Sequence, residues 1–293
     1  MKVHFWGTRG SAPVAGRSTV RFGGNTPCVE VLAADGTSVV LDCGTGARQL
    51  GLALVATNLS TVNLLLTHTH WDHIQGFPFF APAYRSGTRL NIYAASGLAS
   101  SVEEVLAGQI RPDYFPVSWD DLPAQLAVHE VKEGIFSIGG ITVRAQLLNH
   151  TAPCLGYRLE AEGLSVVYAT DHEPFWWEGS EVGLAERLRH EGDRRHAEWL
   201  AGADLLIHDA QYTDAEYPAK RKWGHSPVEY ATDLAILAGV KRLALFHHDP
   251  ARTDQAMTQL VRRLHCRVRD RGSNLDVVAA AEGLDIELPD IPK

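Results

Sequence analysis

The stretch LLLTHTHWDH, residues 64–73, joins an apolar run to four potential metal ligands within six residues. The apolar run predicts a buried strand, and the polar residues follow at its C-terminal end. His68 and His70 are two positions apart, so an extended backbone projects both side chains the same way. Asp72 and His73 then fall at a turn and can point to a second ion. Histidine and carboxylate are common zinc ligands, so the stretch predicts a metal-binding loop.

Strands and helices alternate on both sides of this loop, in two successive halves. Strands are predicted at 3–6, 27–32, 38–41, 61–67, 90–94, 156–159, 165–169, 205–208 and 242–246, with two more within 135–147 and a last one from 275. Helices are predicted at 47–54, 98–107, 227–238 (with Ser226 as the N-cap) and 254–264. Residues 172–196 mix aromatic and charged side chains and read as a covering insertion with a helix. The pattern predicts one domain over residues 1–293, built as two sheets with helices outside.

Composition narrows the class of protein and of partner. The 293 residues are 45% hydrophobic and 21% charged, with a net charge of -8. This acidic balance disfavours long nucleic acid as a partner and favours a small substrate. None of the four cysteines lies in a CxxC pair, which disfavours a thiolate zinc site. No signal peptide and no apolar run of 18 residues is present, so we expect a cytoplasmic protein without a membrane span.

The HxHxDH pattern after an apolar strand resembles the metallo-β-lactamase superfamily. The resemblance covers nearly the whole chain and implies the four-layer αββα sandwich of that superfamily, an α/β (α+β) fold. It also implies a third histidine, a bridging aspartate and a last histidine, each at a strand end. His150, Asp171 and either His247 or His248 follow in that order. His247 is preferred because it directly follows the apolar strand.

Carried over to this chain, the superfamily pattern implies two divalent metal ions. Their ligands would be His68, His70, His150 and Asp171 for one ion, and Asp72, His73, Asp171 and His247 for the other. Zinc is the expected metal, with manganese and iron as alternatives. A bridging hydroxide would attack the substrate while both ions stabilise the developing charge. Asp42 resembles the early strand-end aspartate that orients the metal loop by hydrogen bonds.

Three features resemble the ribonuclease Z and phosphoribosyl cyclic phosphodiesterase branch. The first is the glycine-rich opening at residues 7–13 and 21–26. The second is Gly224-His225-Ser226, similar to the His-Ser-Thr motif of ribonuclease Z, where the histidine is thought to protonate the leaving oxygen. The third is Asp209, which would hydrogen-bond His225 and keep it protonated. The resemblance therefore adds His225, Asp209 and Asp72 as candidate catalytic residues and implies phosphodiester chemistry.

Ribonuclease Z itself fits less well, because its tRNA-gripping arm lies between the third histidine and the bridging aspartate. Here residues 151–170 leave room for a hairpin alone. The expected substrate is a small phosphodiester, including cyclic ones, and the related phosphodiesterases imply a homodimer. Candidate phosphate contacts are Arg9, Arg48 and Lys222; candidate rim aromatics are Phe175, Trp176 and Trp177, together with Tyr114 to Pro116. The aromatic residues have an equally good alternative as core.

Other functions stay open at this point. A ribonuclease Z-like RNA endonuclease and a lactone, β-lactam or thioester hydrolase would use the same metals. A di-iron redox enzyme would need an added flavin domain, for which 293 residues leave no room. A non-catalytic binding module would be expected to lack ligands, and every ligand position here is filled.

Overall fold

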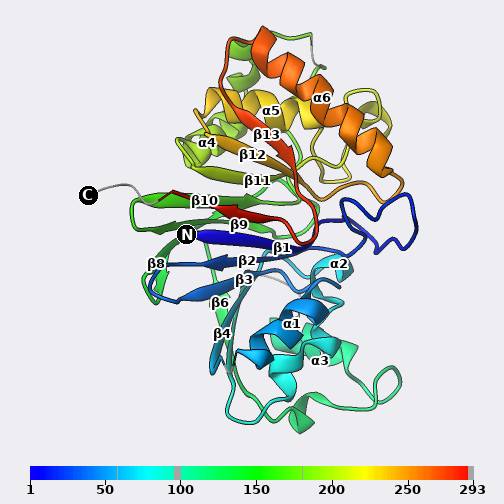
Figure 1. Ribbon diagram of the computed structural model, residues 1–293, viewed down its shortest axis with the longest axis vertical. Helices are drawn as coiled ribbons and strands as arrows, with labels where there is room; N and C mark the ends of the chain where they lie inside the picture. Colours follow the sequence, from blue (N-terminus) through cyan, green and yellow to red (C-terminus); the bar gives the residue numbers. More distant parts are fainter. Residues whose placement is uncertain (58, 96–99, 180, 290–293) are drawn as a thin grey trace.

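Two mixed sheets face each other in the computed structural model, which describes residues 1–57, 59–95, 100–179 and 181–289 (Figure 1). The first sheet has the order β14-β1-β2-β3-β4-β5-β6. Its strands are β1 (Lys2–Gly7), β2 (Cys28–Leu32), β3 (Ser38–Leu41), β4 (Thr61–Leu66), β5 (Arg89–Ala95), β6 (Gln125–Val131) and β14 (Asp285–Glu287). The strands from β3 to β6 run parallel, so their carboxyl ends share one edge of the sheet.

The second sheet has the order β13-β12-β11-β10-β9-β8-β7. Its strands are β7 (Gly134–Ile138), β8 (Ile141–Leu147), β9 (Leu155–Ala161), β10 (Leu164–Ala169), β11 (Leu205–Asp209), β12 (Arg242–Phe246) and β13 (Asp276–Ala279). β10 to β13 are parallel, while β9 is antiparallel to both β8 and β10. β8 therefore points the same way as β10, and the carboxyl ends of β8, β10, β11 and β12 lie at one edge.

Helices cover both outer faces. Their bounds are α1 (Ala47–Ala56), α2 (Trp71–Ile74), α3 (Val102–Gln109), α4 (Glu191–Leu200), α5 (Val228–Leu237) and α6 (Asp254–Asp270). α4, α5 and α6 lie over the second sheet, and α1 and α3 over the first (Figure 1). The predicted four-layer αββα sandwich is confirmed. Among the described residues, no helix combines the length and the apolar character needed to cross a membrane.

Three apolar cores hold these layers together. The central core lies between the sheets and contains Phe5, Leu159 and Phe246, none of them exposed. Each outer core lies between a sheet and its helices, with Leu50 packed in one and Leu234 in the other. Both sheets are thus buried on two faces, which accounts for strands that read as continuous apolar runs.

Three local expectations differ from the structure. β6 was not expected, because its residues are mostly half-buried or exposed and its polar and apolar side chains give no clear alternation. The predicted helix at 98–107 begins at Val102, capped by Ser101, and residues 98 and 99 lie outside the described residues. Ser226 does not cap α5: Pro227 occupies the N-cap position, and the Ser226 hydroxyl donates to the carbonyl of His172 instead.

Candidate metal centre

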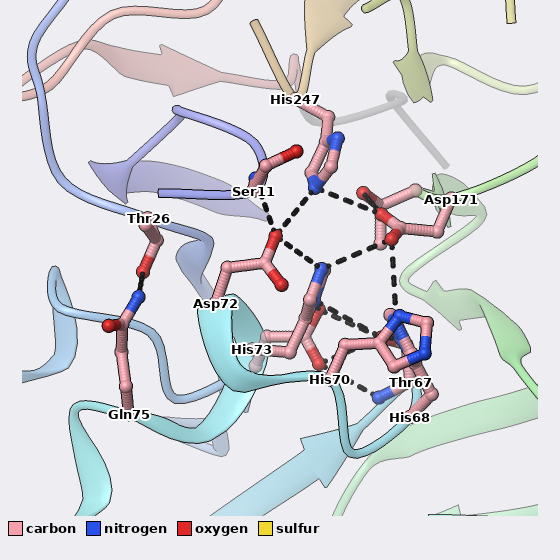
Figure 2. Close-up of polar contacts among 12 residues, drawn as sticks. Ser11, Thr26, Thr67, His68, His70, Asp72, His73, Gln75, Asp171 and His247 are labelled. Atoms are coloured by element: carbon pink, nitrogen blue, oxygen red, sulfur yellow. Dashed lines mark hydrogen bonds and ion pairs between the residues drawn. The ribbon is translucent and has the colours of Figure 1, made fainter. Parts of the chain in front are cut away.

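The histidine-rich loop follows β4 at the edge where the parallel strands end. His70 is still extended, with ψ at 150°, and the chain turns into α2 at the next residue. The extended part projects His68 and His70, and the helical turn redirects Asp72 and His73 (Figure 2). His68 and His73 are buried, whereas His70 is exposed. One side of the loop is therefore open to solvent.

Three distant strand ends bring the remaining candidates to this loop. His150 follows β8, Asp171 follows β10 and His247 follows β12. An Asp171 carboxylate oxygen lies 3.4 Å from Nε2 of His68, and the other lies 3.2 Å from Nε2 of His247. Asp171 also lies 3.3 Å from His73 and 3.7 Å from His150. Asp171 thus contacts histidines of both predicted ligand groups, as a bridging ligand would, and dashed lines mark such contacts in Figure 2.

The donor set fits divalent metal ions. One set of ligand atoms comes from His68, His70, His150 and Asp171 and another from Asp72, His73 and His247, each set lying within 4.8 Å of one another. The Nε2 atoms of His68 and His73 are buried and have no hydrogen-bond partner in the described structure. Buried polar atoms are rarely left unpaired, and a cation would satisfy both. Burial also lowers the pKa of His68, which favours the neutral form that binds metal.

Three strand-end residues adopt a left-handed backbone. Asp42, Asp171 and His247 follow β3, β10 and β12 with φ of 59°, 56° and 57°. This conformation is uncommon for residues other than glycine and costs about 1–3 kcal/mol at each position. It ends the strand at once and turns the side chain into the cluster. Strain that recurs at three strand ends around one cluster marks a functional site.

Asp42 orients the metal loop through hydrogen bonds, as predicted. Its carboxylate accepts hydrogen bonds from the backbone N–H of Thr67 (2.8 Å), from Nδ1 of His73 (2.8 Å) and from the Tyr168 hydroxyl (2.9 Å). The bond to Nδ1 fixes the His73 tautomer and leaves Nε2 directed at Asp171. Asp42 and Tyr168 are both fully buried, so this support is rigid.

The N-terminal loop closes the cluster on the side of Asp72. The backbone N–H of Ser11 donates to a carboxylate oxygen of Asp72 at 2.7 Å (Figure 2). The same oxygen lies 3.0 Å from Nε2 of His247. His248 faces away, because its Nε2 donates to the carbonyl of Ala280 at 2.8 Å. The geometry places His247 rather than His248 in the cluster.

His225 and Asp209 form a second layer beside the cluster. Nδ1 of His225 donates to Asp209 at 2.8 Å, the hydrogen bond that the sequence predicted. The His225 ring stacks on His247 at 4.9 Å and lies 5.5 Å from His150. Burial opposes the charged form, but the Asp209 carboxylate outweighs it and raises the pKa of His225 to about 9. Cations bound next to the ring would pull this pKa back toward neutrality.

Glu173 is a site residue that the sequence reading missed. Its carboxylate accepts hydrogen bonds from the backbone N–H groups of Lys222 (2.7 Å) and Gly224 (2.9 Å) and from the Tyr217 hydroxyl (2.8 Å). The carbonyl of Gly224 accepts from Nδ1 of His150 at 2.9 Å, which fixes the His150 tautomer. Glu173 thus positions His150 through a single residue, Gly224. Its place two residues after Asp171 was the only signal available in the sequence.

A cavity of about 500 Å³ opens next to His150. Its lining includes Glu173, Phe175, Trp176, Trp177, Arg221 and Lys222. Of the segment 172–196, residues 173–178 line this cavity. Trp177 is largely buried, and its indole N–H donates to Asp214 at 2.6 Å. It therefore lines the cavity and also packs in the apolar core.

Two candidate phosphate contacts and the second aromatic rim lie elsewhere. Arg9 is buried, and its guanidinium donates to the backbone carbonyls of Gly23 and Arg252, so it braces loops instead of binding substrate. Arg48 lies on the exposed side of α1 and is not among the residues that line this cavity. Tyr114 is 77% exposed and lines a separate cavity with Trp71.

Comparison with known proteins gives the family. The model of the β-lactamase superfamily domain matches residues 37–248. Ribonuclease Z of Lactococcus lactis subsp. cremoris is 27% identical over 300 residues, covering 89% of this chain and 93% of the relative. The fold is similar to that of the metallo-β-lactamase fold protein YhfI from Bacillus subtilis (TM-score 0.67, 19% identity, 97% and 98% of the two chains). It is also similar to that of a diphosphatase from the PhnP family (TM-score 0.64, 19% identity, 98% of both chains). The family match and the His/Asp cluster together establish that the chain is a metal-dependent hydrolase of the metallo-β-lactamase superfamily.

Proposed function

We propose that this hydrolase is a dinuclear phosphodiesterase that acts on small phosphodiesters, including cyclic ones. The observation that carries the proposal is the His225–Asp209 pair, 2.8 Å apart and buried beside the metal cluster. The alkoxide of a phosphodiester is a poor leaving group, so its departure benefits from a general acid. The thiolate of a thioester is a much better leaving group and departs without such an acid.

The proposed ligands follow the geometry of the cluster. One ion would be held by His68, His70, His150 and Asp171, and the other by Asp72, His73, Asp171 and His247. When bound, such ions lower the pKa of a water molecule and stabilise charge on a phosphate. Zinc suits this set of nitrogen and oxygen donors, with manganese and iron as alternatives.

The residues around the ligands have separate tasks. His225 lies beside His150, with ring centroids 5.5 Å apart, and donates a proton to the leaving oxygen. Asp209 keeps the imidazole oriented through Nδ1, so that Nε2 carries the proton to be donated. Asp209 is itself fixed by the backbone N–H of Gln211 at 3.0 Å. The backbone thus holds Asp209, and Asp209 holds His225 in the orientation that a general acid needs.

The small size of the substrate is supported by the segment between His150 and Asp171. It forms only the β9–β10 hairpin, with no projecting arm. The net charge of -8 also lacks the basic excess that gripping many phosphates requires.

A ribonuclease Z-like RNA endonuclease is the second candidate. It is favoured by relatives of that name, which match this chain over most of their length. An RNA substrate would use the same metals and the same acid. The two candidates differ in how much nucleic acid the protein contacts outside the centre.

The first experiment is hydrolysis of bis(p-nitrophenyl) phosphate, a lactone and a β-lactam, with and without chelator, alongside metal counting. We expect chelator-sensitive turnover of the phosphodiester with about two metals per chain. The panel then extends to cyclic nucleotides, cyclic ribose phosphates and a tRNA with a 3′ extension. Turnover of the lactone or β-lactam alone would refute the phosphodiesterase proposal, and cleavage of the RNA alone would favour the second candidate.

A further inference from the structure

We propose that the cavity beside His150 binds the nucleobase of a nucleoside phosphodiester, with Phe175 and Trp176 as its stacking wall. The proposal rests on the proposed phosphodiesterase function and adds the class of substrate. The cavity is about 500 Å³, within the range of small-ligand sites, and His150 joins it directly to the metal cluster. A phosphate held at the cluster would therefore place its attached nucleoside in this cavity.

The aromatic wall is preformed because its backbone is fixed. The buried carboxylate of Asp193 accepts from the backbone N–H of Phe175 at 3.2 Å and from that of Trp176 at 3.0 Å. Asp193 is held in turn by the Tyr230 hydroxyl at 2.7 Å. A wall that is ordered before binding loses little entropy when a ligand stacks on it.

Each ring is also supported from one side. His190 stacks on Phe175 with ring centroids 5.1 Å apart and planes 6° apart, and Arg189 lies 5.5 Å from the centre of the Trp176 ring. Phe175 is nevertheless 42% exposed, and Trp176 is half-buried. Supported rings that keep exposed area next to a cavity are suited to stacking on a planar group.

The next aromatic residue anchors the wall to the helical layer. Trp177 donates to Asp214, and the guanidinium carbon of Arg187 lies 3.8 Å from the centre of its ring. Arg187 is buried and pairs with Asp233 of α5 at 3.0 Å. Residues 175–177 are thus held in place by Asp193 at their N-terminal end and by the contacts of Trp177 at their C-terminal end.

The charges around the cavity suit an uncharged group. Two cations, Arg221 and Lys222, are balanced by Glu173 and Glu178. Both oxygens of Glu173 already accept hydrogen bonds, so this carboxylate is not free to select a cation. A neutral planar base in the cavity, with its phosphate on the metal side, matches this distribution better than a second anionic group.

The test compares binding of AMP and ribose 5-phosphate, which differ only by the base, to the metal-loaded protein by isothermal titration calorimetry. We expect AMP to bind about tenfold more tightly or better, from the usual strength of base stacking. Trp176→Ala and Phe175→Ala should each remove most of this preference, and Trp176→Phe should retain it. Tyr114→Ala, an exposed aromatic change outside the cavity, should leave it unaltered.

Equal affinity for the two ligands, or an unchanged preference in Trp176→Ala, would overturn the nucleobase proposal. Turnover of bis(p-nitrophenyl) phosphate measured in parallel separates the two proposals. If turnover is present and the base preference absent, only the nucleobase site fails. If the preference is present but no phosphodiester is cleaved, the site stands and the proposed reaction fails. Thermal melting of Trp176→Phe and Trp176→Ala verifies that the variants are folded.

Discussion

Gly224 connects backbone conformation to metal binding at the scale of one residue. Its φ is 86°, and a Cβ atom there would lie 2.1 Å from Nδ1 of His150. We expect Gly224→Ala to lower the free energy of unfolding of the metal-free protein by about 1–3 kcal/mol, from strain alone. It should also weaken metal binding, because the ring of His150 must move off the carbonyl that fixes it. Chemical denaturation and zinc titration measure the two effects.

Gly202→Ala is the matched control for this change. Its φ is 64°, and a Cβ atom there would meet nothing within 4 Å. The control should show the backbone cost without any loss of metal affinity. If both variants bound zinc like the wild type, the link between Gly224 and His150 would be wrong.

The proposed acid makes a second prediction at this scale. His225→Ala should slow cleavage of a diester with an alkoxide leaving group about 10²–10⁴-fold. The loss on bis(p-nitrophenyl) phosphate should be much smaller, since p-nitrophenolate departs without a proton. Asp209→Asn should show the same selectivity, because the two side chains are hydrogen-bonded at 2.8 Å.

The ratio of kcat/KM for the two diesters measures this effect. His129→Ala, which changes a histidine of β6 in the other sheet, serves as the control and should leave the ratio unchanged. An equal loss on both diesters would mean that His225 is not the acid. Metal counts on each variant exclude the alternative that the change has removed an ion.

Single residues differ in how well the sequence predicts them. The loop at 68–73 was predictable because four ligand types follow one apolar strand. Glu173 and Ser11 were not, because each forms a backbone hydrogen bond with a residue distant in the sequence. Glu173 accepts from the backbone N–H of Gly224, and the backbone N–H of Ser11 donates to Asp72. Arg9 was misjudged because a buried arginine that donates to carbonyls has the same sequence signature as one that binds phosphate.

At the scale of elements, hydrophobic periodicity predicted most strands and helices in their order along the chain. The direction of the strands then determines where the site residues meet. Parallel strands put their carboxyl ends at one edge, which brings Asp171, Asp209 and His247 together although they span 77 positions. Edge strand β6 escaped prediction because little of it is buried. The N-cap of α5 was misassigned because the Ser226 hydroxyl satisfies a tertiary contact that no local pattern reveals.

Helix α4 docks on the second sheet through a buried histidine that makes stability depend on pH. His196 stacks on His172 at 3.9 Å, and its Nε2 lies 3.2 Å from Nε2 of His208; Gln146 and Trp199 complete its surroundings. Burial, reinforced by His208, lowers the pKa of His196 well below its usual 6.5. The unfolded chain therefore binds more protons below pH 6.5, and stability is lost as the pH falls.

We expect His196→Phe to reduce by one the number of protons that the chain takes up when it unfolds at low pH. Below pH 6.5, the free energy of unfolding of the wild type should fall more steeply than that of the variant, by about 1.4 kcal/mol per pH unit. Urea denaturation of the metal-free proteins between pH 5 and pH 8 gives both curves. Parallel curves would show that His196 is charged in the folded protein.

For the whole molecule, the excess of acidic residues and the short β9–β10 hairpin bear on the size of the substrate. A protein that neutralises many phosphates of an RNA releases their counterions, so log K falls with log salt at a slope of about -0.7 for each phosphate. A small diester presents one phosphate and has no condensed counterions. We therefore expect log(kcat/KM) for bis(p-nitrophenyl) phosphate to change with log salt at a slope shallower than about -1. If a tRNA with a 3′ extension were cleaved as efficiently, with a slope of about -3 or steeper, the protein would grip several phosphates outside the centre. That result would mean that a local basic surface overrides the net charge of -8, and it would favour the RNA endonuclease over the small-molecule phosphodiesterase.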